Sequence, residues 1–300
     1  MSLARGSIAV LFLLFLLPLH AEEIVVASYN VRNYLKMDRW VDGKRQPDQP
    51  KPESEIQALV GVISHIKPDI LGLIEIGDQS MLADLQSRLK AAGLDYPHSE
   101  WVRGADAVRH VCLLSRFPIV ARNSRDDVPF ELEGKRARIT RGILDVTVEV
   151  NPKYRLRLLG AHLKSRLEVG SYDQEWLRAK EAWFLRQHVE SILEKDPRVN
   201  LALFGDFNDT KNEYPVRELI GWRGSPNYMA DIWLRDSRGE RWTHYWKAAD
   251  SYSRYDYILV SRGLFPEVNL KKSGIDDSPA WNEASDHRAI YTTISATDKR

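Results

Sequence analysis

Short apolar runs alternate along this chain with segments of helical periodicity. Most of the apolar runs are continuous, which is typical of buried strands, whereas apolar and polar residues alternate strictly from Leu144 to Val150, which predicts a strand with one polar face. Several runs end in a turn signal such as Gly205. The predicted strands are 23–29, 69–74, 111–114, 144–150, 155–161, 199–205, 255–260 and 289–294.

Three segments repeat their apolar residues with a period near 3.6 and are predicted helices: 54–66, 80–90 and 171–193. Ser54, with Gln57 three residues later, predicts a capping box for the first helix. The proline-containing segment 31–52 is expected to be a polar loop. Because strands follow one another both directly and through helices, the sequence predicts an α/β fold of mixed β-sheets covered by helices in one domain.

The N-terminal segment 1–21 has the pattern of a signal peptide: Arg5, an apolar stretch from Ile8 to Leu19, and Ala21 as a cleavage residue. The apolar stretch is shorter than the roughly 20 residues that span a bilayer. We therefore expect a secreted or periplasmic protein whose mature domain covers 22–300, with an uncleaved N-terminal anchor as the alternative. No later stretch is apolar enough to span a membrane. The single cysteine, Cys112, excludes an intrachain disulfide and is expected to be a buried apolar residue.

The formal net charge of +1 gives no global basic field for nucleic acid. Basic residues nevertheless gather in the segment 134–141, where Arg136, Arg138 and Arg141 are candidates for binding substrate phosphates. The alternative is a solvated face. Aromatic residues of the later chain either pack a loop or stack on bases: Trp233, Trp242, Tyr245, Trp246 and Tyr252.

Polar residues stand where the predicted strands end or begin. Any one of them has an ordinary interpretation as a turn residue, a carboxylate at a helix dipole or a core histidine. Antiparallel strands bring starts and ends to one rim of a sheet, so together these residues predict a cleft. They are Asn30, Glu75, His162, Asp206, Asp286 and His287.

The residue types in this set favour phosphate-ester hydrolysis with a hard cation. Oxygen ligands without thiolates suit Mg²⁺ or Mn²⁺, with Ca²⁺ as a further candidate, and do not form the usual set for zinc. In the motif from Gly205 to Asn208, Asp206 is able to take a proton from water and Asn208 is able to donate hydrogen bonds to an anion.

Six motifs in chain order resemble the endonuclease/exonuclease/phosphatase superfamily, over residues 24–294. This resemblance implies a deoxyribonuclease I-like fold, a four-layer sandwich of two mixed β-sheets flanked by helices, and metal-dependent phosphoester hydrolysis. The motifs are Ser28-Tyr29-Asn30, Ile74-Glu75, His162-Leu163-Lys164-Ser165, Gly205-Asp206-Phe207-Asn208, Arg254-Tyr255-Asp256-Tyr257-Ile258 and Ser285-Asp286-His287.

The resemblance also implies a role for each matching residue. Glu75 is implied as the main metal ligand, with Asn30 and Asp286 beside it. Asp206 is implied to orient or deprotonate the attacking water, and Asn208 to bind the phosphoryl oxygens.

The implied histidine roles are less fully assigned. His287 is implied to contact the scissile phosphate, with Asp256 on its other ring nitrogen, and His162 is a second catalytic or phosphate-binding imidazole. Arg254 is implied to support Asp256 or the substrate. The resemblance leaves open whether base and acid are Asp206 and His162 or the two histidines.

No subfamily pattern is matched in full. Apurinic endonucleases carry tyrosine and asparagine where His162 and Ser165 stand, the lipid-inserting hairpin of sphingomyelinases is not evident, and the paired cysteines of secreted deoxyribonucleases are missing. The first interpretation is a phosphodiesterase that cuts DNA or RNA. The alternative is a phosphomonoesterase or lipid-headgroup phosphodiesterase, and a remote alternative is a binding module without catalysis. No stable protein partner is implied.

Overall fold

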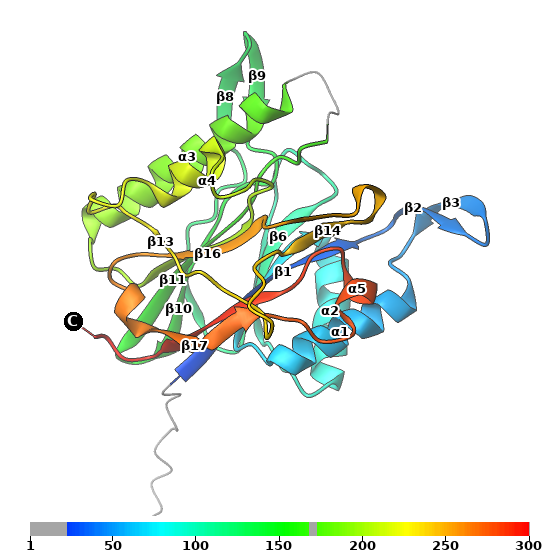
Figure 1. Cartoon of the computed structure of the whole chain (residues 1–300), viewed down its shortest axis with the longest axis horizontal. Coiled ribbons are helices and arrows are strands. Elements are labelled where there is room, and N and C mark those ends of the chain that lie inside the picture. Colours follow the sequence, from blue (N-terminus) through cyan, green and yellow to red (C-terminus); the bar gives the residue numbers. More distant parts are fainter. Residues whose placement is uncertain (1–22, 168–172, 300) are drawn as a thin grey trace, which may run out of the picture.

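The computed structural model describes residues 23–167 and 173–299, and it contains two six-stranded mixed sheets (Figure 1). The predicted signal peptide lies outside the described residues. The first sheet has the strand order β17 (Val268–Ile275), β18 (Ile290–Ser295), β1 (Glu23–Tyr34), β4 (Ile70–Ile76), β6 (His110–Ser115) and β5 (His98–Val102). The second has the order β13 (Ala230–Asp231), β16 (Asp256–Val260), β12 (Leu201–Asp206), β11 (Tyr154–His162), β10 (Leu144–Asn151) and β7 (Ile119–Arg122).

Three separate hydrophobic clusters show that these sheets and their helices form four layers. One cluster lies between the two sheets and contains residues of both, such as Ile74 and Phe204. A second joins the first sheet to the helices α1 (Glu53–Ile66), α2 (Gln79–Ala91) and α5 (Trp281–Ala284). A third joins the second sheet to α3 (Gln174–Lys195) and α4 (Tyr214–Ile220). The four-layer α/β sandwich expected from the sequence is therefore confirmed.

The two sheets approach closely where Phe204 of β12 faces glycines. A Cβ atom added to Gly72 of β4 would lie 2.1 Å from the Phe204 ring, and one added to Gly160 of β11 would lie 2.6 Å from it. The ring fills the space that the absent side chains leave. Gly160 is the neighbour of Phe204 within the second sheet, whereas Gly72 belongs to the first sheet. Since interiors are packed at crystal-like density, the contact of Phe204 with Gly72 fixes the distance between the sheets that carry the site.

Two local predictions were wrong. The capping box fails because the first helix begins at Glu53, so that Ser54 lies inside its first turn and the N-cap residue is Pro52, without a side-chain cap. The expected loop 31–52 contains a hairpin of β2 (Met37–Val41) and β3 (Lys44–Gln49), which turns through Asp42 and Gly43, both at positive φ. This hairpin has no buried face, so it lacks the apolar alternation that reveals a strand in sequence.

Two further expectations concern the cysteine and membrane spans, and the smaller elements complete the fold. Cys112 is a free, buried cysteine on β6, as expected. No helix among the described residues has the length and apolar character needed to cross a bilayer. The remaining elements are the strands β8 (Pro129–Leu132), β9 (Lys135–Arg138), β14 (His244–Trp246) and β15 (Ser251–Ser253), and the 3₁₀ helices η1 (Lys247–Ala249) and η2 (Phe265–Glu267).

Candidate active site

Strand register in the second sheet places three of the predicted site residues side by side. β12 pairs in parallel with β11 and antiparallel with β16, so that His162 lies opposite Asp206 and Asp206 lies opposite Asp256. Gly205 makes this register possible, because a Cβ atom there would lie 1.8 Å from the Ala161 carbonyl oxygen. A histidine and two carboxylates therefore lie on three adjacent strands at one rim.

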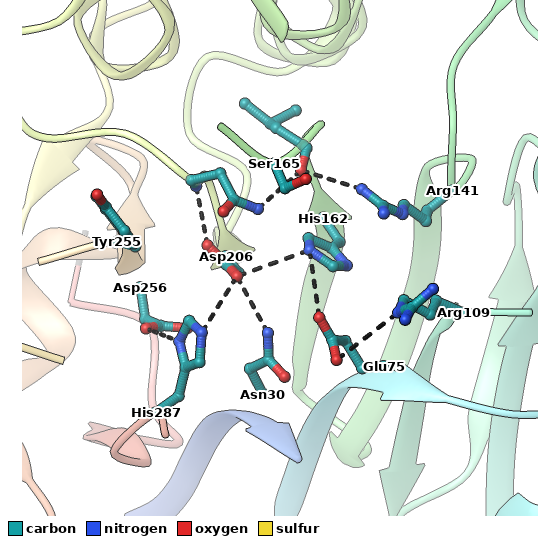
Figure 2. Close-up of polar contacts among 12 residues, drawn as sticks. Asn30, Glu75, Arg109, Arg141, His162, Ser165, Asp206, Tyr255, Asp256 and His287 are labelled. Atoms are coloured by element: carbon teal, nitrogen blue, oxygen red, sulfur yellow. Dashed lines mark hydrogen bonds and ion pairs between the residues drawn. The ribbon is translucent and has the colours of Figure 1, made fainter. Parts of the chain in front are cut away.

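The first sheet contributes its residues to the same point. The Asn30 amide at β1 donates a hydrogen bond of 3.0 Å to Asp206 Oδ2. The Ser285 hydroxyl donates to the Asn30 carbonyl oxygen at 2.8 Å and accepts the backbone N–H of His287 at 3.1 Å. Asp206 is thus contacted from both sheets, as Figure 2 shows.

Glu75 reaches the cleft through an unusual backbone conformation. Its φ of 70° lies in the left-handed region, where the pairing of β4 with β6 is interrupted between Ile74 and Ile76. This conformation costs a non-glycine residue about 1 kcal/mol or more. The Glu75 carboxylate accepts the Asn33 backbone N–H at 2.9 Å, and its other oxygen lies 3.9 Å from His162 Nε2. A strained, interrupted strand therefore aims this carboxylate into the cleft.

His287 is held by a buried carboxylate. Its Nδ1 donates to Asp256 Oδ2 at 2.8 Å, and its Nε2 lies 3.7 Å from Asp206 Oδ2. Burial favours the neutral ring, but the charges of Asp256 and Asp206 outweigh burial and raise the pKa of His287 well above its usual value. His287 is therefore a cationic imidazole that faces Asp206.

His162 has the opposite electrostatic character. Its Nε2 lies 3.6 Å from Asp206 Oδ2, and its buried Nδ1 has no hydrogen-bond partner among the described residues. Burial, together with the positive charges of Arg141 and His287, lowers the pKa of His162 well below its usual value. The site thus pairs a neutral imidazole with a cationic one on either side of one carboxylate.

That carboxylate is itself tuned for proton exchange. Burial raises the pKa of Asp206 to about 7, with a further contribution from Asp256, although His287 acts in the opposite direction. The backbone N–H of Asn208 donates to Asp206 Oδ1 at 2.8 Å. The Asn208 side chain donates one of its two amide protons to the Leu163 carbonyl oxygen at 3.0 Å and keeps the second for another acceptor.

The oxygen donors around Glu75 fit a hard divalent cation. One carboxylate oxygen of Glu75 accepts no hydrogen bond from the described residues, and the Asp286 carboxylate is about one-third exposed, with Arg32 at 3.6 Å. Within the described part of the chain, Asn30 Oδ1 accepts only the Arg32 backbone N–H, at 3.0 Å. These are the donor types that Mg²⁺ and Mn²⁺ prefer. Asp206, Asp256 and His287 also have possible ligand atoms within 4.8 Å of one another, but a His287 ring protonated on both nitrogens has no lone pair to offer a metal.

Of the predicted substrate-binding arginines, Arg141 lines the cleft, whereas Arg136, Arg138 and Arg254 do not. Arg254 forms a bidentate pair with Asp231, with distances of 2.8 and 2.5 Å, and lies over the Tyr257 ring. Arg136 and Arg138 lie on β9, in a hairpin that stands apart from the cleft, and Arg138 pairs with Asp127 at 3.4 Å. The positive charges of β9 therefore lie on a solvated strand. The spacing of like charges in a sequence does not indicate which face of the fold they line.

The cleft has a volume of about 580 Å³ and is lined by cations that the sequence motifs did not single out as site residues. Lys164 was within reach of sequence reasoning, because it stands two residues after His162 and therefore on the same side of an extended chain. Arg109 gave a weaker signal, as the residue just before β6. Of the predicted stacking residues, only Trp246 lines the cleft, while Tyr252 packs between Trp242 and Tyr245. The unpredicted cations are Arg32, Arg109, Lys164 and Arg166.

Comparison with known proteins agrees with this geometry. Residues 27–287 match the model of the Endonuclease/Exonuclease/phosphatase family. Fold and site together define a metal-dependent phosphoester hydrolase. The chain belongs to the endonuclease/exonuclease/phosphatase family. No curated protein matches its sequence.

Similar solved structures show the same fold at low identity. Truncated Caenorhabditis elegans TDP2 is 16% identical over 91% of this chain and 98% of its own, with a TM-score of 0.60. The human Nocturnin catalytic domain with bound sulfate is 17% identical over 92% and 95%, with a TM-score of 0.62. The beta toxin of Staphylococcus aureus is 15% identical over 90% and 99%, with a TM-score of 0.59.

Proposed function

We propose that this protein is a divalent-metal-dependent phosphodiesterase that hydrolyses DNA or RNA outside the cytoplasm. The observation that carries the proposal is the placement of Asp206 between a neutral His162 and a cationic His287, with Asn30 as a fixed donor. This arrangement supplies a proton acceptor and an electrostatic stabiliser within one cleft.

Each residue of the centre has a separate role in the proposed reaction. A cation held by Glu75, Asn30 and Asp286 would neutralise phosphoryl oxygens and the leaving alkoxide. Asp206 accepts a proton from the attacking water, since its pKa of about 7 matches neutral conditions. His287 and Asn208 donate hydrogen bonds to phosphoryl oxygens as their charge grows. The alternative assignment gives the roles of base and acid to the two histidines, His162 and His287.

A small phosphate ester is the second candidate substrate. The near-neutral net charge of +1 favours it, because a nuclease without a basic field must rely on its cleft alone. Nucleic acid remains the first choice since cations and the exposed ring of Trp246 share one cleft.

Cleavage of two substrates tests the proposal. The purified protein, with Mg²⁺ or Mn²⁺, is expected to nick plasmid DNA and to hydrolyse bis-p-nitrophenyl phosphate, and EDTA is expected to abolish both reactions. Asp206→Ala and His287→Ala each remove a group that acts in the transition state, so each is expected to reduce kcat/KM at least about 100-fold.

His98→Ala serves as the matched control, because His98 lies on the edge strand β5 and does not line the cleft. It is expected to retain full activity. Cleavage of the small diester alone would move the assignment to the second candidate. A folded protein that cuts neither substrate would overturn the phosphodiesterase assignment.

A further inference from the structure

The cleft has two unlike sides around the reacting centre. On one side lie Arg109, Arg141 and Lys164, with Asp106 among them; we call these four residues the cationic lobe. On the other side lie the rings of His244, Trp246 and Tyr255. Figure 2 shows Arg109 and Arg141 on one side of Asp206 and Tyr255 on the other.

The single carboxylate of the cationic lobe is already engaged. Asp106 accepts the backbone N–H groups of Val108 at 2.9 Å and Arg109 at 3.2 Å, and it accepts Arg141 Nε at 3.3 Å. Arg141 is buried and also donates to the Leu163 carbonyl oxygen at 3.2 Å. Arg109 lies 3.9 Å from Glu75. The lobe therefore carries more positive charge than its own carboxylate can balance.

Lys164 is the clearest surplus cation. Its backbone N–H is fixed by the buried Glu181 carboxylate at 2.6 Å, so the residue has a defined position. Its ammonium group forms no ion pair or hydrogen bond with the described residues. Burial and the neighbouring Arg141 lower the pKa of the Lys164 ammonium from its usual value. A cation held in a cleft beside other cations, with no carboxylate bonded to its ammonium group among the described residues, suits an anionic ligand.

We propose that the cationic lobe is a second phosphate subsite, which binds the phosphate adjacent to the scissile one on the same nucleic-acid strand. Lys164 lies just beyond the end of β11 at His162, and both residues line the same cleft. Trp246, 54% exposed, and Tyr255 offer ring faces for a base on the opposite side. This inference rests on the proposed nuclease function and names its substrate class more closely.

Inhibitors with one or two phosphates test the subsite. Hydrolysis of bis-p-nitrophenyl phosphate is measured with metal in excess, against thymidine 3′,5′-bisphosphate and the two thymidine monophosphates. The bisphosphate is expected to inhibit at least tenfold more strongly than either monophosphate. Lys164→Gln is expected to reduce that ratio to about twofold, and Lys164→Arg is expected to preserve it.

Lys153→Gln is the matched control, since it makes the same charge change in the turn at the opposite end of β11 from His162, and it is expected to keep the wild-type ratio. An equal effect of one and two phosphates, or a full ratio in Lys164→Gln, would refute the subsite. Calorimetric titration gives the same ratio without turnover. Failure of hydrolysis alone therefore counts against the proposed function and leaves the subsite testable.

Inorganic tripolyphosphate distinguishes a strand from any polyanion. If the rings take a base, the bisphosphate is expected to bind more tightly than tripolyphosphate, and Trp246→Ala is expected to remove most of that advantage. Equal binding of both, unaffected by Trp246→Ala, would contradict the nucleic-acid part of the proposal.

Discussion

At the scale of single residues, the site depends on which charges are buried together. Asp256 and His287 form a buried, hydrogen-bonded pair, and Asp256 Oδ1 has no hydrogen-bond partner among the described residues. The charge of Asp256 is the largest of the three carboxylate charges, with Asp206 and Asp286, that keep His287 protonated. Asp256 therefore both orients the imidazole and sets its charge, as a positioning residue for the histidine.

The substitution Asp256→Asn tests whether the activity depends on the charge of Asp256 and not merely on the stability of the fold. The amide keeps the size of the side chain but removes its charge, so the pKa of His287 falls and the cationic form is lost at a lower pH. We expect kcat to fall about 100-fold or more, with the alkaline limb of the kcat/KM profile shifted to lower pH. An unchanged limb, measured over pH 5 to 9, would show that Asp256 does not hold the charge.

Asp42→Asn provides the control for this substitution. It makes the same chemical change in the exposed turn of the β2–β3 hairpin, at a positive φ that asparagine tolerates. Its activity and its pH profile are expected to match those of the unchanged protein.

Residue types alone were enough to nominate most of the centre. Each of Asn30, Glu75, His162 and Asp206 ends an apolar run, and the structure brings all four together. Lys164 stands in the motif from His162 to Ser165 but was not nominated, and Arg109 was not nominated because a surface arginine has the same sequence signal wherever it points. The pairing of Arg254 with Asp231 joins the segment just before β16 to β13, a strand of two residues that is too short to predict.

At the scale of elements, the pairing of β11 with β12 is the step that assembles the site. Gly205 has a φ of 149° and leaves no room for a Cβ atom against the Ala161 carbonyl oxygen. Any side chain there would push β12 away from β11 and shift Asp206 out of register with His162.

Two glycine substitutions test this argument. Gly205→Ala is expected to lower the free energy of unfolding by about 3 kcal/mol or more, from overpacking and strain combined, and to abolish activity. Gly43→Ala, at a φ of 74° with nothing within 4 Å, carries the conformational cost alone and is expected to lose about 1 kcal/mol. Urea denaturation of both variants gives the comparison, and equal losses would contradict the steric argument.

The four inner strands of each main sheet were predicted, whereas the edge strands β17, β5, β13 and β7, the short helix α4 and the outlying hairpins were not. All eight predicted strands correspond to strands of the two main sheets, since those strands carry continuous or alternating apolar residues. The β2–β3 and β8–β9 hairpins lack such a pattern. The start of α1 was misplaced because Pro52 supplies the entry geometry that a serine cap was expected to supply.

At the scale of the whole molecule, the proposed location depends on residues 1–21. We expect expression of the full chain in a Gram-negative host to deliver the protein to the periplasm, with an N-terminus at residue 22. Fractionation followed by N-terminal sequencing checks this prediction. A chain that is recovered from the cytoplasm with residues 1–21 intact would contradict it, whereas a membrane-bound full chain would indicate the uncleaved anchor.

The chain order of the strands has a consequence for biosynthesis. Among the described strands, β1 is made first and β18 last, and β1 lies between β4 and β18. The site likewise draws on Asn30 near the start and His287 near the end. A ribosome that stops early therefore releases a chain with an open sheet edge and no second imidazole. If the enzyme cuts nucleic acid, we expect only full-length molecules to expose the host to that activity, because a truncated chain lacks His287.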